Sequence, residues 1–104
     1  MSWIVLVFSG VLEAVWAVAL GRSEGFSRPV PTVVFVVALL MSMGGLAFAM
    51  RDLPTGTAYA VWVGIGATIT VAWGMVTGTE PVTLLRVVFL AMIVGGVVGL
   101  KAVH

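Results

Sequence analysis

The segment SWIVLVFSGVLEAVWAVAL, residues 2–20, contains one charged side chain, Glu13, in an otherwise apolar run. A helix rises about 1.5 Å per residue, so about 20 residues of this kind cross the hydrocarbon core of a membrane. Three further apolar runs follow, at residues 30–50, 57–79 and about 84–103. Charges in these runs are confined to Arg86 and Lys101, near the two ends of the last one. The sequence therefore predicts four transmembrane helices.

The composition also indicates an integral membrane protein. Of the 104 residues, 62% are hydrophobic and 9% are charged, whereas about 25% of the residues in a soluble domain are charged. The runs are too long and too uniformly apolar for barrel strands, so we expect an all-α fold in a single four-helix domain, residues 1–104. The first run lacks the basic start of a signal peptide and is interpreted as a retained helix.

Several classes of function are excluded by residue type. The chain has no cysteine, which excludes disulfides and cysteine-ligated metals, and its single histidine, His104, argues against a histidine metal site. There is no nucleophile paired with a base, no phosphate loop and no metal cluster, so we expect neither a conventional enzyme nor a cofactor. The net charge of +1 gives no indication of nucleic acid binding.

The Gly, Pro and charged residues gather between the runs, which predicts loops at residues 21–31, 51–56 and 78–83. With four spans, Arg51 and Lys101 lie on the side of the N-terminus, and Arg22, Arg28 and Arg86 lie on the other. Because the asymmetry of Lys and Arg orients membrane proteins, this near balance of two against three favours dual topology. We expect the same chain to insert in both orientations and to pair as an antiparallel homodimer.

Glu13 is the candidate functional residue. It lies about ten residues beyond Trp3, roughly 15 Å along the helix axis and thus near the midplane. A charged side chain at this depth costs about 2.5 to 3.5 kcal/mol on insertion scales and commonly marks an ion or substrate pathway. The alternative is a protonated glutamate with a structural hydrogen bond. The central portions of the spans hold no other charge that could pair with Glu13, which favours the functional interpretation.

Residues on the same helix face as Glu13 are candidates for its surroundings, because positions three and four apart are neighbours. Gly10 could let a ligand approach the backbone, or it could simply pack against another helix. Trp16 could donate its N–H to the carboxylate or stack on a cation. Ser42, near the middle of the second run, is either part of the same polar site or bonded to its own helix.

The third run places Tyr59, Trp62 and Gly66 on one face, and the two aromatic side chains fit either core packing or an interfacial girdle. Gly64 and Gly66 lie near its middle, where glycine eases bending, and we expect a hinge there.

In the fourth run, Gly95, Gly96 and Gly99 form a small-residue pattern suited to close helix contact. We interpret these glycines as part of the dimer interface.

Five stretches together resemble the small multidrug resistance family, specifically its guanidinium-exporter subtype, over essentially the whole chain. They are GVLEAVWA (10–17), GFSR (25–28), LPTGTAYAVWVGIGA (53–67), EPVTLLR (80–86) and GLK (99–101). Trp16, three residues after Glu13, distinguishes this subtype from the exporters of polyaromatic drugs. Two positions depart from the pattern of the subtype: Gly21 replaces a common lysine, which affects the loop contacts, and Val63 replaces a common threonine, which affects pocket polarity.

The resemblance implies an antiparallel homodimer in the bacterial inner membrane that exchanges protons for a guanidinium cation by alternating access. It implies that Glu13 is the shared proton and substrate site. The resemblance assigns a binding frame to Trp16, Ser42, Tyr59 and Trp62, and a place in the pocket to Gly10. The first three runs would line the pathway and the fourth would hold the dimer together. The implied partners are the cation, protons, membrane lipids and a second copy of the chain.

Other functions remain open at this level. A broader exporter of quaternary ammonium compounds would use the same glutamate with a pocket open to bulky apolar groups. A small passive ion channel would conduct without a proton gradient. One subunit of a paired heterodimer is a further alternative, although the near balance of cations argues against it.

Overall fold

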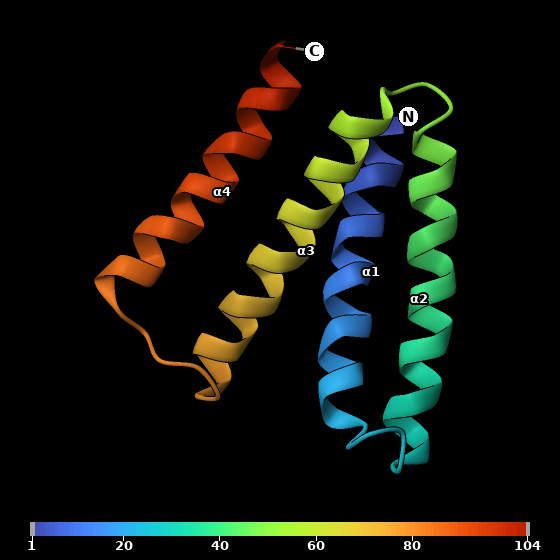
Figure 1. Ribbon diagram of the computed structural model, residues 1–104, viewed down its shortest axis with the longest axis vertical. Coiled ribbons are helices and arrows are strands. Elements are labelled where there is room, and N and C mark those ends of the chain that lie inside the picture. Colours follow the sequence, from blue (N-terminus) through green and yellow to red (C-terminus); the bar gives the residue numbers. More distant parts are fainter. Residues whose placement is uncertain (1, 104) are drawn as a thin grey trace.

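The computed structural model describes residues 2–103 and contains four helices. They are α1 (Ser2–Arg22), α2 (Pro29–Ala49), α3 (Thr55–Thr77) and α4 (Leu84–Val103), as Figure 1 shows. Each is long and apolar enough to cross a membrane. The prediction of four apolar helices and an all-α membrane fold is therefore confirmed, and every observed helix end lies within two residues of the expected one. His104 lies outside the described residues.

The helix ends follow from the proline and glycine residues. Pro29 stands in the first turn of α2, where a missing N–H leaves no hydrogen bond unmade. The first loop is consequently shorter than the expected 21–31. Pro54 directly precedes α3, and Gly78 ends this helix in the left-handed conformation, with φ of 81° and its N–H donated to the carbonyl of Gly74. Glycine adopts this conformation without the steric penalty of a side chain.

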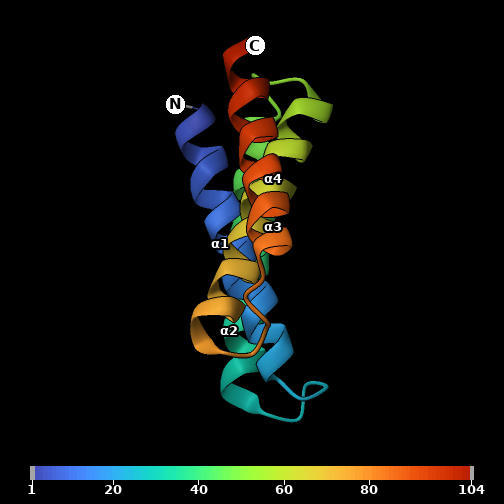
Figure 2. The same ribbon diagram turned by 90° about the vertical axis from the view of Figure 1, so that its left-hand side faces the viewer.

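Helix α1 is the centre of the packing, because it contacts both α2 and α3, which contact each other much less. The buried core lies toward the end of the bundle that carries the N-terminus; its members are Leu6, Leu46, Ala49, Leu53, Ala58, Val61 and Trp62. The backbone of α4 comes close only to that of α3 among the four described helices, and α4 has no buried residue. The chain forms a slab of 41 × 34 × 17 Å, and Figure 2 shows its thin edge.

The two ends of the slab carry different loops. The start of α1, the loop between α2 and α3, and the end of α4 lie together at one end (Figure 1). Arg51 and Lys101 are thus on the side of the N-terminus, and the loops before α2 and α4 lie at the opposite end. Lys101 Nζ lies 5.5 Å from the centre of the Trp3 ring, so a cation–π contact links the end of α4 to the start of α1.

Candidate functional site

Glu13 lies near the middle of α1, where its partly buried side chain faces Gly66 of α3. A Cβ atom placed on Gly66 would collide with the Oε1 oxygen of Glu13. The absence of a side chain at residue 66 therefore makes the room that the carboxylate occupies. Helix α3 runs without interruption through this position, so the glycine that we expected as part of a hinge has an immediate packing function here.

The carboxylate of Glu13 has no ionic partner in the described part of the chain. The one salt bridge within residues 2–103 joins Arg86 Nη1 to Glu80 Oε1 at 3.2 Å, near the start of α4. None of the hydrogen bonds among these residues involves the Glu13 side chain either. An ionisable group near the middle of a long apolar helix, unpaired among residues 2–103, is available to a proton or to a bound cation.

Three helices are joined beside Glu13 by a buried chain of hydrogen bonds. Trp62 Nε1 donates to Ser42 Oγ at 3.0 Å, and Ser42 Oγ donates to the carbonyl oxygen of Ser9 at 2.7 Å. Ser9 Oγ in turn donates to the carbonyl oxygen of Val5 at 2.7 Å. Ser42 thus bonds across to α1 and α3, and the alternative in which it bonds to its own helix is not observed.

The hydrogen-bond chain and the carboxylate occupy adjacent layers of the bundle. Ser9 stands four residues before Glu13 on α1, and Trp62 stands four residues before Gly66 on α3. Helices α1 and α3 run in the same direction (Figure 1), so the two pairs are stacked about 6 Å apart, one helical turn. The layer of Ser9 and Trp62 therefore fixes the spacing of the two helices that enclose Glu13.

Aromatic side chains complete the surroundings. Tyr59 lies against Trp62, with ring centres 6.0 Å apart and planes at 31°, and its side chain is exposed. Trp16 meets Phe35 of α2 edge to face at 5.9 Å. The buried Nε1 of Trp16 has no hydrogen-bond partner among residues 2–103, so its N–H is not donated to Glu13 in this structure. Trp16 thus retains an unused donor.

The remaining glycines separate into packed and open positions. Gly10 packs against Ile65, since a Cβ on Gly10 would lie 2.8 Å from the Ile65 side chain. Of the two roles expected for Gly10, approach of a ligand or packing against another helix, the structure shows the packing. A Cβ on Gly64 would lie 2.6 Å from Val97 of α4. In contrast, α4 carries glycines whose Cβ positions have no neighbouring atom within 4 Å: Gly95, Gly96 and Gly99. The proposed dimer-interface residues therefore lie on an open face.

Three positions at the site were missed by sequence reasoning. A Cβ on Gly45 would collide with the Ser9 hydroxyl, and the spacing of three residues from Ser42 was a usable signal because such residues share a helix face. Phe35 and Ile65, the partners of Trp16 and Gly10, are ordinary apolar helix residues and carry no such signal. No group of three metal-ligating side chains occurs within residues 2–103.

The sequence is similar to a known family of membrane proteins along most of its length. The pattern of the family described as "Small Multidrug Resistance protein" matches residues 1–93. The "Guanidinium exporter" of Escherichia coli (strain K12) is 52% identical over 101 residues, covering 97% of this chain and 96% of that protein. The proteins of the same name from Proteus vulgaris and Salmonella typhimurium are 48% and 46% identical, each across 97% of this chain and 97% and 96% of their own lengths. This multi-pass membrane protein therefore belongs to the small multidrug resistance family.

Proposed function

We propose that this protein exports guanidinium and small substituted guanidinium cations in exchange for protons. The observation that carries the proposal is the carboxylate of Glu13, near the middle of a membrane span and without a partner among residues 2–103. Such a group is expensive to retain in a membrane unless it serves a pathway. Relatives 46% to 52% identical are named guanidinium exporters, which supports this class of substrate.

The chemistry of the cation fits the chemistry of the site. Guanidinium is planar and presents paired N–H donors that match the two oxygens of a carboxylate. The exposed ring of Tyr59, backed by the buried Trp62, offers a cation–π contact, and the Trp16 N–H has no hydrogen-bond partner among residues 2–103. Ser42 holds the Trp62 indole in place at 3.0 Å, and Gly10 keeps α3 close to α1. We assign these residues to the binding frame around Glu13.

Competition at the carboxylate couples the two ions. A proton and a guanidinium cation each neutralise the same negative charge, so Glu13 holds one or the other. If the binding site can change the side of the membrane it faces only when its charge is neutralised, it moves outward with the cation bound. It must then return inward with protons bound. This is alternating access, and we propose Gly64 and Gly66 as the places where α3 bends during the change.

We further propose that two copies form the transport unit as an antiparallel homodimer in the bacterial inner membrane. The described residues form a slab 17 Å thick, which leaves little room for a pathway inside one copy, and α4 has no buried residue. The open face of α4 at Gly95, Gly96 and Gly99 suits close helix contact with a second copy. Two carboxylates of Glu13 would then face one pathway between the chains.

Transport is tested with purified protein in liposomes, by recording currents after pulses of guanidinium and, separately, of tetraethylammonium. The wild type is compared with Glu13→Gln and with the matched control Glu24→Gln, which removes an exposed carboxylate from a loop. We expect saturating guanidinium currents in the wild type and the control, and none in Glu13→Gln despite intact assembly. Proton-coupled transport by Glu13→Gln would contradict the mechanism.

The other outcomes of this experiment identify the alternatives. Comparable currents for both cations would replace the selective exporter by a broader exporter of quaternary ammonium compounds. Silence for both cations from folded protein would favour a subunit that requires a different partner.

Dual topology is tested by single-cysteine accessibility in cells, which is straightforward because the chain has no native cysteine. A cysteine at the exposed loop position Ser27 should be labelled from both sides of the membrane. Labelling from one side alone would reject dual topology.

A further inference from the structure

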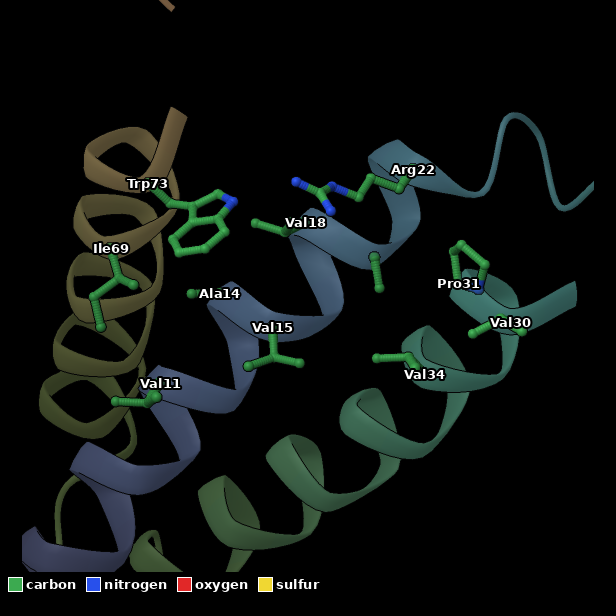
Figure 3. Close-up of a pocket in the computed structure, with 11 residues that line it drawn as sticks. Val11, Ala14, Val15, Val18, Arg22, Val30, Pro31, Val34, Ile69 and Trp73 are labelled. Atoms are coloured by element: carbon green, nitrogen blue, oxygen red, sulfur yellow. The ribbon is translucent and has the colours of Figure 1, made fainter. Parts of the chain in front are cut away.

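An apolar groove of about 400 Å³ runs along α1 between α2 and α3. Figure 3 shows side chains from all three helices pointing into it. The walls include Val11, Val15 and Val18 of α1, Val34 of α2, and Ile69 and Trp73 of α3. Arg22, at the end of α1, is the one charged residue that lines the groove.

This groove is separate from the site of Glu13, which does not line it. Val11 and Val15 stand two residues before and after Glu13, and residues two apart lie on nearly opposite sides of a helix. The carboxylate therefore faces one side of α1 and the groove occupies the other. Nothing in the proposed binding frame uses the groove.

The length of the groove matches one leaflet of a membrane. From Val11 to Arg22 the helix rises about 16 Å, and half of a hydrocarbon core is about 15 Å. The inner end of the groove thus lies near the midplane, beside the depth of Glu13. Its outer end lies at the level where phospholipid headgroups begin, and a single acyl chain would extend along it.

The outer end carries the polar chemistry that a headgroup requires. Arg22 is exposed and forms no salt bridge or hydrogen bond with other side chains in the described part of the protein. Figure 3 shows its guanidinium and the indole of Trp73 directed toward each other across the mouth of the groove. Guanidinium groups bind phosphate oxygens in a bidentate way, and tryptophan favours this interfacial depth.

We propose that this groove binds a phospholipid, with one acyl chain between α1, α2 and α3 and the phosphate at Arg22. An anionic headgroup, such as that of phosphatidylglycerol, is preferred because Arg22 forms no salt bridge with an acidic side chain among residues 2–103. The acyl chain fills the space between the diverging ends of α2 and α3. It thereby packs against the side of α1 that lies opposite Glu13.

The site is tested by photo-crosslinking. Wild-type protein is reconstituted in phosphatidylcholine vesicles that contain a small fraction of phosphatidylglycerol with a diazirine midway along one acyl chain. After irradiation, adducts are mapped by mass spectrometry. Val34 and Val33 provide an internal comparison, because they are adjacent on α2, lie at the same depth and are 42% and 61% exposed, yet only Val34 lines the groove.

We expect adducts at Val34 to exceed those at Val33, although Val33 is the more exposed residue. Unlabelled phosphatidylglycerol should compete better than phosphatidylcholine, by roughly fivefold, the factor that corresponds to about 1 kcal/mol per basic residue at an anionic surface. Arg22→Gln should abolish this preference, and the matched control Arg28→Gln should retain it. Val15→Phe, which fills the groove while keeping the cation, should reduce the adducts at Val34.

Three results would overturn the proposal. Adducts at Val34 and Val33 in proportion to their exposure would show ordinary bulk lipid. Absence of adducts along the groove would show that another chain covers it. Displacement of the lipid by an alkylated guanidinium, but not by phosphatidylglycerol, would assign the groove to the substrate. Each readout is independent of transport activity, so the lipid site and the proposed function are judged separately.

Discussion

Substitution of Gly66 by alanine tests directly how α3 accommodates the carboxylate of Glu13. A Cβ at this position would collide with Oε1 and would also lie 2.7 Å from Cγ of Glu13. Contact with Cγ means that rotation of the carboxylate alone gives no relief, so the side chain must leave its present rotamer. We expect Glu13 to remain ionisable but to lose its position between α1 and α3.

Gly66→Ala should change the free energy of guanidinium binding more than the free energy of unfolding. Alanine is favoured over glycine inside a helix by about 1 kcal/mol, while an extra methyl group in a packed position costs about 1 to 3 kcal/mol. The net cost is therefore at most about 2 kcal/mol, which a native protein with about 5 to 15 kcal/mol of stability tolerates, so the folded protein should persist. A hydrogen bond to a charged group contributes about 1.5 to 3 kcal/mol, and its loss weakens guanidinium binding roughly ten- to hundredfold.

The assay is guanidinium affinity of detergent-purified protein by calorimetry, accompanied by thermal unfolding. Gly44→Ala is the matched control, because it adds the same methyl group to the interior of a helix, α2, at a position where no neighbouring atom lies within 4 Å. Its affinity should equal that of the wild type. Wild-type affinity in a folded Gly66→Ala variant would refute the argument that residue 66 makes room for the carboxylate.

The Ser42–Trp62 hydrogen bond, the Lys101–Trp3 contact and the charge of Glu13 can each be removed separately. Ser42→Ala leaves the buried Trp62 N–H without an acceptor and should destabilise the protein by about 1 to 3 kcal/mol; because Trp62→Phe removes the donor as well as core volume, the double variant should lose less stability than the sum of the two single variants, and additive losses in thermal unfolding would contradict the hydrogen-bond chain. Lys101→Gln removes the cation–π contact with Trp3, worth about 0.5 to 2 kcal/mol, and should broaden the distances between spin labels on α1 and α4; an unchanged distribution would show that this contact does not hold α4. Lowering the pH should weaken guanidinium binding, by up to about tenfold per pH unit where one proton competes, and Glu13→Gln should show no such competition by calorimetry.

The helices and the depth of the acidic residue were predictable from sequence because both depend on properties local to the chain. Four apolar runs of membrane-crossing length permit one kind of backbone arrangement, since every buried peptide group must be bonded within its own helix. Proline and glycine then place the ends: Pro29 and Gly78 stop or start helices whatever surrounds them. The depth of Glu13 follows from counting residues along a helix of fixed rise.

The partners of these residues were decided only by the tertiary structure. Helical periodicity states which side chains share a face of their own helix, but not which neighbouring helix that face meets. Ser42 could have bonded to α2 itself; packing brought it to Ser9 and Trp62. Gly66 was expected to be a hinge residue, and the close approach of α1 also made it the space for Glu13. Sequence determines what each helix offers to its surroundings, whereas the contacts depend on how the helices are rotated and spaced against one another.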